Sequence, residues 1–227
     1  MPDTVMIFAA GRGTRMGALT DAQPKPMVSV AGKPLLDHAL QVVDGSEAIS
    51  KIVVNTHYLA DQIHTHLADR DVLFSHEEEL LETGGGLKQA LALRNMPELV
   101  TLNADATWSG PNPINALLKA WDPSRMDALL LMVPPENAIG HLGKGDFTMA
   151  PDGQLTRGPG LVYVGCQIIK SSRVAQVTDD VFSLNVVWDV IRQSSRLFGL
   201  SYSGRWCDVG HPGGIELAEQ MLGDTHV

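Results

Sequence analysis

The sequence predicts one α/β domain built on a mainly parallel, Rossmann-like sheet with helices on both faces. Short apolar segments rich in Val, Ile and Leu alternate with amphipathic segments through about the first 133 residues. Strands that are apolar along their whole length are typical of parallel sheets covered on both faces. After about residue 140, turns and shorter strands take over, which predicts a small antiparallel elaboration in the last third. The 227 residues are enough for a sizeable core, and no linker or internal repeat divides them.

Five strands and three helices are expected in the first part of the chain. The strands are Val5–Ala10, Lys51–Thr56, Val72–Ser75, Leu99–Asn103 and Ala128–Val133. In each helix, the residues named below are spaced three or four positions apart, which places them on one face of the helix. These faces contain Leu35, Leu36, Ala39, Leu40 and Val43 in the first helix, Leu59, Ile63 and Leu67 in the second, and Leu87, Leu91 and Arg94 in the third.

The last third is expected to begin with a hairpin. The segment GDFTMAPDGQL turns at residues 151–153, where Pro, Asp and Gly are typical turn residues. The elements expected after it are a long strand at Leu161–Ile169, a helix at Phe182–Gln193, one or two strands within LFGLSYSGRWCDVG, and a final helix at Gly214–Leu222.

The composition argues against several classes of protein. No apolar run reaches the roughly 18 residues of a membrane helix, and the start of the chain resembles no secretory leader, so we expect a cytoplasmic protein. The net charge is −9, which argues against a nucleic-acid surface. Cys166 and Cys207 lie far apart in the sequence, so two free thiols are expected.

The loop after the first strand, FAAGRGTRMGALTDAQPKP, is basic although the whole chain is acidic. From Arg12 to Lys33 there are four cations and a single acid, Asp21. In open parallel sheets, ligands bind beyond the carboxyl ends of the strands, and the first loop is the usual phosphate site. The loop is therefore suited to a small, strongly negative ligand.

The glycines of this loop match neither common phosphate-binding motif. Gly11, Gly13 and Gly17 are not spaced as in the dinucleotide fingerprint, and no Gly-Lys-Ser/Thr follows. Phosphate binding would rest on backbone amides of the turn together with Arg15 and Lys25; the alternative is a glycine-rich turn with solvated basic residues. The prolines on either side of Lys25 restrict its backbone, which favours a lysine aimed at a phosphate.

Several motifs occur in order along the whole chain: FAAGRGTRM, PKP, VAGKPLLDH, ETGGGL, NADA, GKGDF and GRWCDVG. Together they resemble the signature of the sugar-1-phosphate nucleotidylyltransferases, above all the compact N-acetylmuramate-1-phosphate uridylyltransferases and the hexose-1-phosphate guanylyl- and uridylyltransferases. The resemblance implies one nucleotidyltransferase domain over residues 1–227, with a nucleotide-binding half at about 1–140 and a sugar-binding half at 141–227. It implies an NTP (UTP or GTP) and a sugar 1-phosphate as ligands, neither nucleic acid nor membrane as a partner, and a monomer or weak homo-oligomer.

Two carboxylates are placed to hold Mg²⁺. Asp105 ends the segment LVTLNAD, at the sheet edge where the site is expected, and Asp208 lies before a glycine turn in WCDVG. Either could instead be an Asx turn or a helix cap. In the family that the chain resembles, the matching positions hold the metal, and Mg²⁺ commonly takes only one or two protein carboxylates.

The resemblance also implies the phosphate contacts. Arg15 and the amides of Gly11 and Gly13 would bind the β- and γ-phosphates, whereas Lys25 would lie between the α-phosphate and the sugar phosphate. For Arg12 a solvated position is the alternative.

The base is expected between the segments FAAG, which contains Ala9 and Ala10, and HEEELLETGGG. Glu77 falls where relatives place a Gln or Glu that reads the base edge. A carboxylate only accepts hydrogen bonds, which suits uracil, thymine and guanine and leaves these three open. Thr83 and the glycine run that starts at Gly84 would let the backbone approach the nucleotide closely.

The sugar-side candidates are Asp146, from GKGDF, and Tyr163 and Gly165, from LVYVGC. Each could instead belong to the hairpin or to packing. Many relatives carry a lysine or glutamate in the segment where this chain has Ser183 and Asn185, which leaves the identity of the sugar open.

The resemblance implies a Mg²⁺-dependent transferase that makes a nucleotide sugar, with UTP and N-acetylmuramate 1-phosphate as the preferred substrates and cell wall recycling as the setting. A mannose-1-phosphate guanylyltransferase that uses GTP is the nearest alternative. A protein that binds nucleotide sugars without turnover is the alternative of a different class. The histidines have no metal-ligand spacing, and we expect no chemistry from them.

Overall fold

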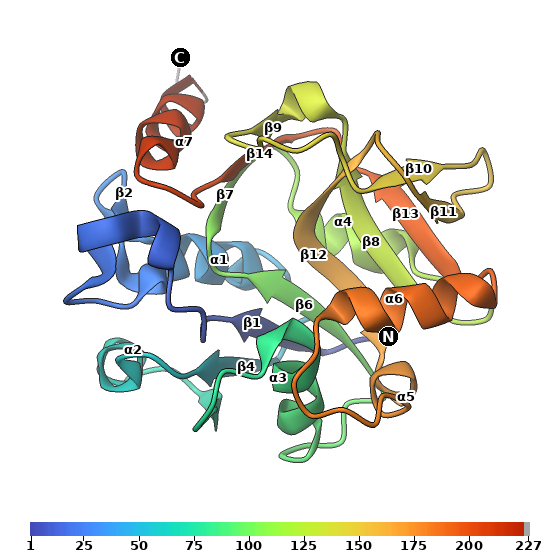
Figure 1. The fold of residues 1–227 in the computed structure, drawn as a ribbon, viewed down its shortest axis with the longest axis horizontal. Coiled ribbons are helices and arrows are strands. Elements are labelled where there is room, and N and C mark those ends of the chain that lie inside the picture. The colour runs from blue at the N-terminus through green and yellow to red at the C-terminus, as the bar shows by residue number, and fades with distance from the viewer. Residues whose placement is uncertain (225–227) are drawn as a thin grey trace.

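A seven-stranded sheet forms the centre of the computed structural model, which describes residues 1–224 (Figure 1). Its strand order is β13-β8-β12-β6-β1-β4-β5. The strands are β1 (Thr4–Phe8), β4 (Lys51–Thr56), β5 (Val72–His76), β6 (Glu98–Asn103), β8 (Ala128–Val133), β12 (Val162–Lys170) and β13 (Leu197–Ser201). All neighbours pair in parallel except β12, which is antiparallel to both β6 and β8. The expectation of a mainly parallel sheet is confirmed, and strands from both parts of the chain belong to it.

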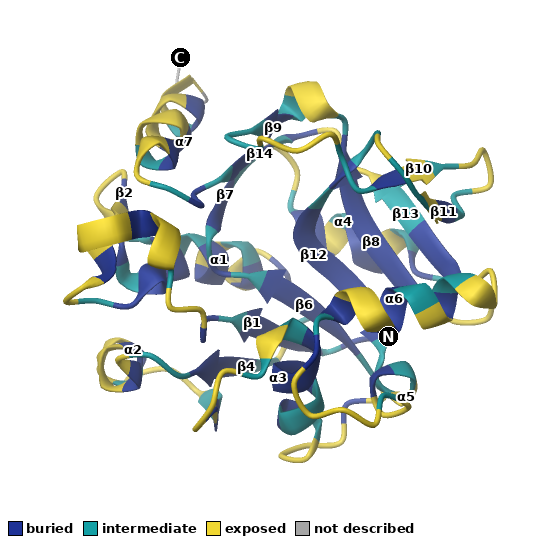
Figure 2. Ribbon diagram, viewed as in Figure 1, coloured by how far each residue is buried: buried dark blue, intermediate teal, exposed yellow. Residues whose placement is uncertain are grey.

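Helices cover both faces of the sheet. α3 (Glu82–Leu91) and α6 (Leu184–Gln193) lie in front of it in Figure 1, and α1 (Leu35–Asp44) and α4 (Pro113–Ala120) lie behind. β1 illustrates the sharing of residues between the faces: Val5 and Ile7 pack toward α1 and α4, whereas Met6 packs toward α3 and α6. Figure 2 shows the strands buried and the outer sides of the helices exposed. Alternate residues of each strand thus enter two separate cores.

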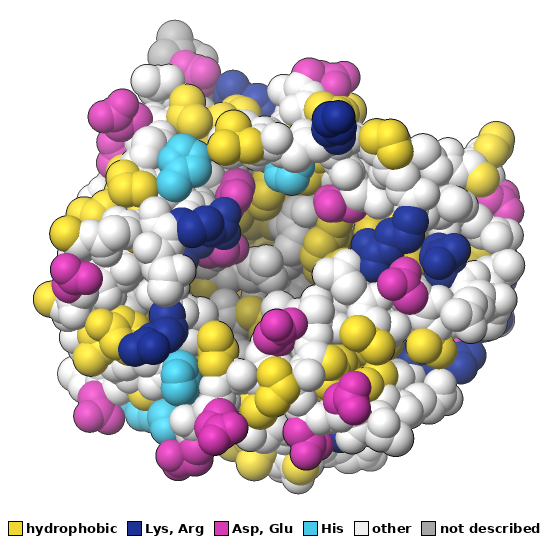
Figure 3. All heavy atoms as spheres, in the orientation of Figure 1, with side chains coloured by type: hydrophobic (Ala, Val, Ile, Leu, Met, Phe, Trp, Pro, Cys, Tyr) yellow, Lys and Arg dark blue, Asp and Glu magenta, His cyan; other side chains and the backbone are white. Residues whose placement is uncertain are grey.

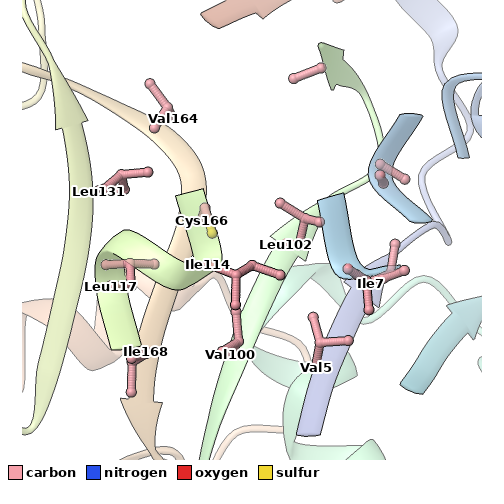
Figure 4. Close-up of a cluster of buried hydrophobic side chains, with 14 of the residues drawn as sticks. Val5, Ile7, Val100, Leu102, Ile114, Leu117, Leu131, Val164, Cys166 and Ile168 are labelled. Atoms are coloured by element: carbon pink, nitrogen blue, oxygen red, sulfur yellow. The ribbon is translucent and has the colours of Figure 1, made fainter. Parts of the chain in front are cut away.

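The core behind the sheet is mostly aliphatic. Ile114 and Leu117 of α4 lie against Val100 and Leu102 of β6 and Cys166 of β12 (Figure 4). All five side chains are fully buried. Burial raises the pKa of the Cys166 thiol, so this cysteine behaves as a small apolar residue.

The five strands expected before residue 140 are all present, with small changes at their ends. β1 stops at Phe8, so Ala9 and Ala10 already belong to the loop. The helix expected at Phe182–Gln193 starts at Leu184 because Ser183 caps it: its Oγ accepts a hydrogen bond from the Asn185 amide at 3.2 Å. The hairpin at residues 151–153 is confirmed by β10 (Phe147–Met149) and β11 (Leu155–Arg157).

The two strands allowed for within LFGLSYSGRWCDVG are present, but the sequence prediction missed α4, β7 (Ala106–Ser109) and β9 (Ala138–Ile139), and with them a second, three-stranded sheet. This sheet contains β7, β14 (Arg205–Asp208) and β9, with β14 in the middle. α4 has a recognisable start, since Asn112 accepts a hydrogen bond from the Asn115 amide and Pro113 occupies the first turn. The strands β7 and β9 are too short to give a period in the sequence.

The third helix was placed too late by the sequence prediction. α3 runs from Glu82 to Leu91, so it includes the glycine run and excludes Arg94. A Cβ at Gly85 would lie 2.1 Å from the Asp180 carbonyl oxygen, and one at Gly84 would lie 2.4 Å from the Phe182 ring. The helix begins with glycines because they let its first turns approach residues 180–182. No periodic pattern in the sequence indicates this contact.

The remaining elements are short, apart from the last helix. They are the 3-10 helices η1 (Thr14–Thr20), η2 (Lys25–Met27) and η3 (Pro135–Asn137), the helices α2 (Ala60–His66) and α5 (Ser171–Val174), and the two-stranded pair β2 (Ser29–Val30) and β3 (Lys33–Pro34). The last helix, α7 (Gly213–Gly223), confirms the expected final helix. Within residues 1–224, none of the helices combines the length and apolar character needed to cross a membrane.

Asp127 joins three segments at the amino end of β8. Its carboxylate, only 4% exposed, lies 3.0 Å from Lys170 Nζ, 2.7 Å from Arg173 Nε and 2.9 Å from Arg196 Nε. Burial alone would raise its pKa, but the hydrogen bonds from Arg196, Lys170 and Arg173 outweigh it and lower the pKa. The ionised form is therefore stabilised in the folded protein.

We expect Asp127→Asn to lower the free energy of unfolding by about 3–5 kcal/mol at pH 7, as when one partner of a buried ion pair is removed. A carboxyl whose folded pKa is lowered stabilises the fold above its unfolded pKa of about 3.9. That contribution disappears as the pH falls through the lowered folded pKa. Urea unfolding at pH 7 and near pH 3 measures both values, with Asp69→Asn at an exposed position as control. A variant within 1 kcal/mol of the unaltered protein at pH 7 would contradict the prediction.

Candidate active site

A cavity of about 360 Å³ opens at the carboxyl ends of β1, β4 and β6. Its position is the one expected for a ligand in an open parallel sheet. In Figure 3 the face of the molecule is hollowed at its centre. The wall is formed by Phe8, Ala9, Ala10, Gly11, Lys25, Pro26, Asn55, Glu77, Leu80, Glu82, Thr83, Asn103, Asp105 and Ser183.

The loop after β1 forms one wall of the cavity. The Ala9 amide donates to Asn55 Oδ1 at 2.8 Å, which ties the start of the loop to the neighbouring strand β4. Gly11 is exposed, and a Cβ there would contact nothing within 4 Å. Arg12 is not simply solvated, because its guanidinium lies 5.1 Å from the centre of the Tyr58 ring. The backbone near Gly11 is thus open to a ligand.

Lys25 is held in a fixed position beside the loop. Gly13 has φ +66°, and a Cβ there would lie 2.6 Å from Lys25 Cβ, so glycine leaves room for the lysine stem. The Lys25 side chain is only 8% exposed, and its Nζ donates to Asp105 Oδ2 at 2.8 Å. The ammonium therefore reaches the cavity from a packed stem.

Asp105 and Asp208 come together although they lie about a hundred residues apart. Asp105 precedes β7 and Asp208 ends β14, which pairs with β7 so that Asp208 lies opposite Ala106. The Val209 amide donates to the Asp105 carbonyl at 3.0 Å. Burial and the charge of Asp105 raise the pKa of Asp208. The two carboxylates thus repel each other across one small site.

Arg15 lies in the same cluster. A Cβ at Gly210 would be 3.1 Å from Arg15 Nη1 and 2.9 Å from Asp208 Oδ2, so glycine lets the two groups approach each other. The positive charges of Lys25 and Arg15 oppose the rise in the pKa of Asp208, and the neighbouring His141 acts in the same direction. His141 therefore belongs to the surroundings of this site, which the sequence prediction did not foresee.

The carboxylate pair fits a hard divalent cation. Two carboxylates in a partly buried site offer the oxygen ligands that Mg²⁺ prefers, and a cation between them would relieve their repulsion. In residues 1–224 no group of three or more His, Cys, Asp or Glu side chains could hold a metal. A cation at the pair would therefore complete its shell with substrate oxygens and water.

Glu77 lines the cavity beside Asn55 and the start of α3. It is 1% exposed. Its Oε1 accepts from Asn55 Nδ2 at 2.7 Å and its Oε2 accepts from the Leu81 amide at 3.0 Å. A Cβ at Gly86 would lie 2.4 Å from Glu77 Oε1. Both carboxylate oxygens are thus engaged within the protein, and Glu77 fixes Asn55 and the entry to α3.

Thr83 and Gly84 are held by the segment before α6. The Leu184 amide donates to Thr83 Oγ1 at 3.0 Å, and the Gly84 amide donates to the Phe182 carbonyl at 2.8 Å. Thr83 lines the cavity, whereas Gly84 is turned toward Phe182. The neighbouring Glu82 lines the cavity with φ +59°, a strained conformation for a residue with a side chain.

The sugar-side candidates lie behind the cavity wall. Asp146 Oδ2 accepts from the Tyr163 amide at 2.9 Å. The Tyr163 ring meets the Trp188 ring at 4.8 Å between centres. Gly165 has φ +74°, and a Cβ there would lie 2.7 Å from Asn103 Cγ, so this glycine leaves room for Asn103, which lines the cavity. None of the three candidates lines the cavity itself.

Three polar residues that line the cavity were not among the site residues predicted from the sequence. Asn55 and Asn103 are at the carboxyl ends of β4 and β6, and Ser183 precedes α6. A polar residue at the carboxyl end of an otherwise apolar parallel strand is a usable signal for a ligand contact. Ser183 was noted only because many relatives carry a charged side chain in its segment, and that difference did not indicate a contact with a ligand.

Comparisons with known proteins agree with this arrangement. A family model described as a MobA-like NTP transferase domain matches residues 5–145. An N-acetylmuramate alpha-1-phosphate uridylyltransferase of Caulobacter vibrioides is 36% identical, over 99% of this chain and 98% of its own length. An enzyme with the same name from Neisseria meningitidis is 31% identical, over 96% of this chain and 97% of its own length.

Solved structures share the fold across nearly the whole chain. HddC from Yersinia pseudotuberculosis, complexed with GMP-PN, superposes with a TM-score of 0.78 at 22% identity, covering 96% of this chain and 99% of that one. A UTP-bound UGPase from Acinetobacter baumannii superposes with a TM-score of 0.79 at 16% identity, covering 98% of this chain and 94% of that one. The motifs of the sequence, the cavity at the end of the parallel strands and the full-length relatives lead to one conclusion: the chain belongs to the MobA-like NTP transferases and is a nucleotidyltransferase of the sugar-1-phosphate nucleotidylyltransferase family.

Proposed function

We propose that the protein transfers the uridylyl group of UTP to N-acetylmuramate 1-phosphate, giving a nucleotide sugar and pyrophosphate, and that Mg²⁺ is its cofactor. The observation that carries this proposal is the similarity of the whole chain to two enzymes named for that reaction, at 36% and 31% identity. The grouping of Arg15, Lys25, Asp105 and Asp208 supports turnover over mere binding.

The reaction needs positioning and charge neutralisation more than proton transfer. An oxygen of the sugar phosphate attacks the α-phosphorus of UTP, and pyrophosphate leaves. The attacking phosphate is already ionised at neutral pH, so no general base is needed. Asp105 and Asp208 would hold Mg²⁺, which when bound neutralises charge on the triphosphate.

The side chains around the pair divide the remaining work. Lys25 would place its ammonium between the α-phosphate and the sugar phosphate, whose mutual repulsion opposes the reaction. Arg15, together with the amides of Gly11 and Gly13, would bind the β- and γ-phosphates. The exposed position of Arg15 suits the outer phosphates, and the packed stem of Lys25 suits the reacting centre.

The base would lie between Ala9–Ala10 and the entry to α3. Thr83 and Gly84 belong to that entry, and Glu77 would act there by fixing Asn55, whose side chain lines the cavity beside it. Asp146, Tyr163 and Gly165 would belong to the sugar side, where they support the wall between β12 and α6.

We also propose one domain over residues 1–227, in which about 1–140 bind the nucleotide and 141–227 the sugar. The inclusion of β12 and β13 in the central sheet supports a single domain. A cytoplasmic monomer or weak homo-oligomer, acting in the recycling of cell wall sugars, fits the proposed substrate. The two buried free thiols, Cys166 and Cys207, suit a reducing compartment.

A pyrophosphate-release screen tests the proposal. UTP, GTP, CTP and dTTP are each offered with N-acetylmuramate, N-acetylglucosamine, glucose and mannose 1-phosphates, with and without Mg²⁺. We expect the highest kcat/KM for UTP with N-acetylmuramate 1-phosphate, and no turnover after chelation of the metal. Preference for GTP and mannose 1-phosphate would replace the proposed substrates, and nucleotide binding without turnover in any pair would refute the enzymatic proposal.

Glu77→Gln is expected to weaken the preference for UTP over CTP by about tenfold. A glutamine can accept at only one end, so it cannot satisfy both the Asn55 amide and the Leu81 amide, and the loss of one such bond costs about 1–3 kcal/mol. Asn55 would then lose its fixed orientation at the cavity. Competition between UTP and CTP measures the change, with Glu78→Gln at an exposed neighbour as control. Unchanged selectivity in Glu77→Gln would show that the backbone alone reads the base.

A further inference from the structure

A second basic cluster lies beside the cavity, between β11 and α6. Arg157 Nε lies 3.0 Å from Asp189 Oδ1, and Arg192 Nε lies 3.7 Å from the same oxygen. The two arginines thus share one carboxylate oxygen. In Figure 3, Lys and Arg side chains gather on two opposite sides of the central hollow.

The guanidinium of Arg157 is fixed in place. It lies 4.5 Å from the centre of the Phe147 ring and 5.7 Å from that of Trp188. Its Nη2 donates to Asn185 Oδ1 at 2.7 Å and to the Asn185 carbonyl at 3.3 Å. Stacking and hydrogen bonding together hold the planar group in one orientation.

Part of the guanidinium remains available. The hydrogen bonds of Arg157 use Nε and Nη2, so Nη1 has no hydrogen-bond partner within residues 1–224. The side chain is 31% exposed. A fixed, partly exposed guanidinium whose Nη1 can still donate hydrogen bonds is suited to bind a carboxylate on a ligand.

Arg157 is linked to the cavity wall through two hydrogen bonds. Ser183, which lines the cavity, accepts from Asn185 Nδ2 at 3.0 Å. Asn185 in turn accepts from Arg157. Trp188, below the guanidinium, also meets the ring of Tyr163 on the sugar side. The guanidinium thus lies next to the wall that faces the proposed sugar.

Two other cations of the site lie beside the carboxylate pair. Lys25 is bonded to Asp105, and Arg15 lies beside Asp208. Both are therefore placed for phosphates and not for a second anion on the sugar. A carboxylated sugar needs one more cation, and the Arg157 cluster provides it on the opposite side of Ser183.

We propose that Arg157 binds the carboxylate of an acidic sugar 1-phosphate, the lactyl ether group in N-acetylmuramate 1-phosphate, and that Asn185 and Asp189 position it. This inference rests on the proposed function, and it names the residue that selects the acidic sugar. Asn185, in the segment where many relatives carry a lysine or glutamate, accepts hydrogen bonds from Arg157 Nη2 through its side-chain oxygen and its backbone carbonyl.

The test compares two sugars that differ in the lactyl ether. Kinetics with UTP are measured for N-acetylmuramate 1-phosphate and N-acetylglucosamine 1-phosphate in the unaltered protein, Arg157→Gln, Arg157→Lys and Arg192→Gln. We expect Arg157→Gln to lower kcat/KM for the acidic sugar by about 10- to 100-fold, mostly through KM, as when one charge-assisted hydrogen bond is lost. The value for the neutral sugar should change little. For Arg157→Lys, kcat/KM for the acidic sugar should lie between the values for the unaltered protein and Arg157→Gln. Lysine keeps the positive charge but lacks the planar guanidinium that can donate two parallel hydrogen bonds.

Arg192→Gln is the matched control. It removes the same charge from the same aspartate but lies at the last turn of α6, away from Ser183, so its effect on both sugars should be small. A calorimetric titration of each variant with each sugar phosphate gives the same comparison where turnover is low. Equal losses for both sugars in Arg157→Gln would overturn the carboxylate site while leaving the proposed function intact. If the unaltered protein did not prefer the acidic sugar, the proposed substrate and this site would both be refuted.

Discussion

Asp208→Asn and Asp105→Asn are each expected to lower kcat for nucleotidyl transfer by about 10³-fold or more. The loss corresponds to the several kcal/mol that a metal ion contributes to a phosphoryl transition state. Each substitution removes one of the two carboxylates that face each other between β7 and β14. Only one of the two carboxylates would then remain to hold Mg²⁺, and a higher concentration of the metal would recover part of the rate.

The stability of these variants separates a metal site from a structural one. Burial and the charge of Asp105 raise the pKa of Asp208, so the ionised pair is a source of repulsion in the folded protein. We therefore expect the melting temperature of Asp208→Asn to equal or exceed that of the unaltered protein. Asp69→Asn, at an exposed position, should leave both rate and melting temperature unchanged. Full activity in either Asp208→Asn or Asp105→Asn would remove the metal assignment. A large drop in the melting temperature of Asp208→Asn would indicate a structural role for that residue.

Lys25→Met is expected to lower kcat by about 10²–10³-fold, as when one donor to a developing oxyanion is lost. Methionine keeps the length of the buried stem that packs on Gly13, but it removes the ammonium from Asp105 and from the reacting phosphates. Because the phosphates crowd together most in the transition state, kcat should fall far more than KM for the NTP rises. Initial rates over a range of NTP concentrations separate the two constants.

Arg15→Met gives the matched comparison for Lys25. Arg15 is exposed and is proposed to contact the outer phosphates, so its loss should raise KM for the NTP more than it lowers kcat. A normal kcat in Lys25→Met, with only weaker NTP binding, would make Lys25 an ordinary docking residue. The same change in both variants would show that the buried and the exposed cation do not differ in role.

The sequence predicted the sheet and the position of the loop after β1 well because both depend on local patterns. β1, β4, β5, β6 and β8 are continuous apolar segments, and such segments are readable without knowledge of their neighbours. The pair of Asp105 and Asp208 was expected from motif resemblance and comes together through the pairing of β7 with β14. Neither short strand has a period of its own, so their pairing could not be predicted from spacing.

What the sequence did not predict depends on contacts between distant segments. The glycines of α3 appeared suited to approach a ligand, yet Gly84 and Gly85 are required by the passage of residues 180–182. Glu77 appeared to be a free acceptor, yet Asn55 and Leu81 already use both of its oxygens. Each outcome depends on which backbone lies opposite, and that information is set by tertiary packing.

The central position of β14 in the small sheet has a consequence for the order of assembly during synthesis. β14 pairs with β7 and with β9, which the ribosome delivers far earlier, and it supplies Asp208 at its last residue. Contacts across such long stretches of chain are costly to close and form slowly. A nascent chain can therefore complete much of the central sheet while its carboxylate pair is still missing one member. The active site would then be completed in one of the last folding events. A chain whose synthesis is not finished would therefore not consume nucleoside triphosphates in the cell.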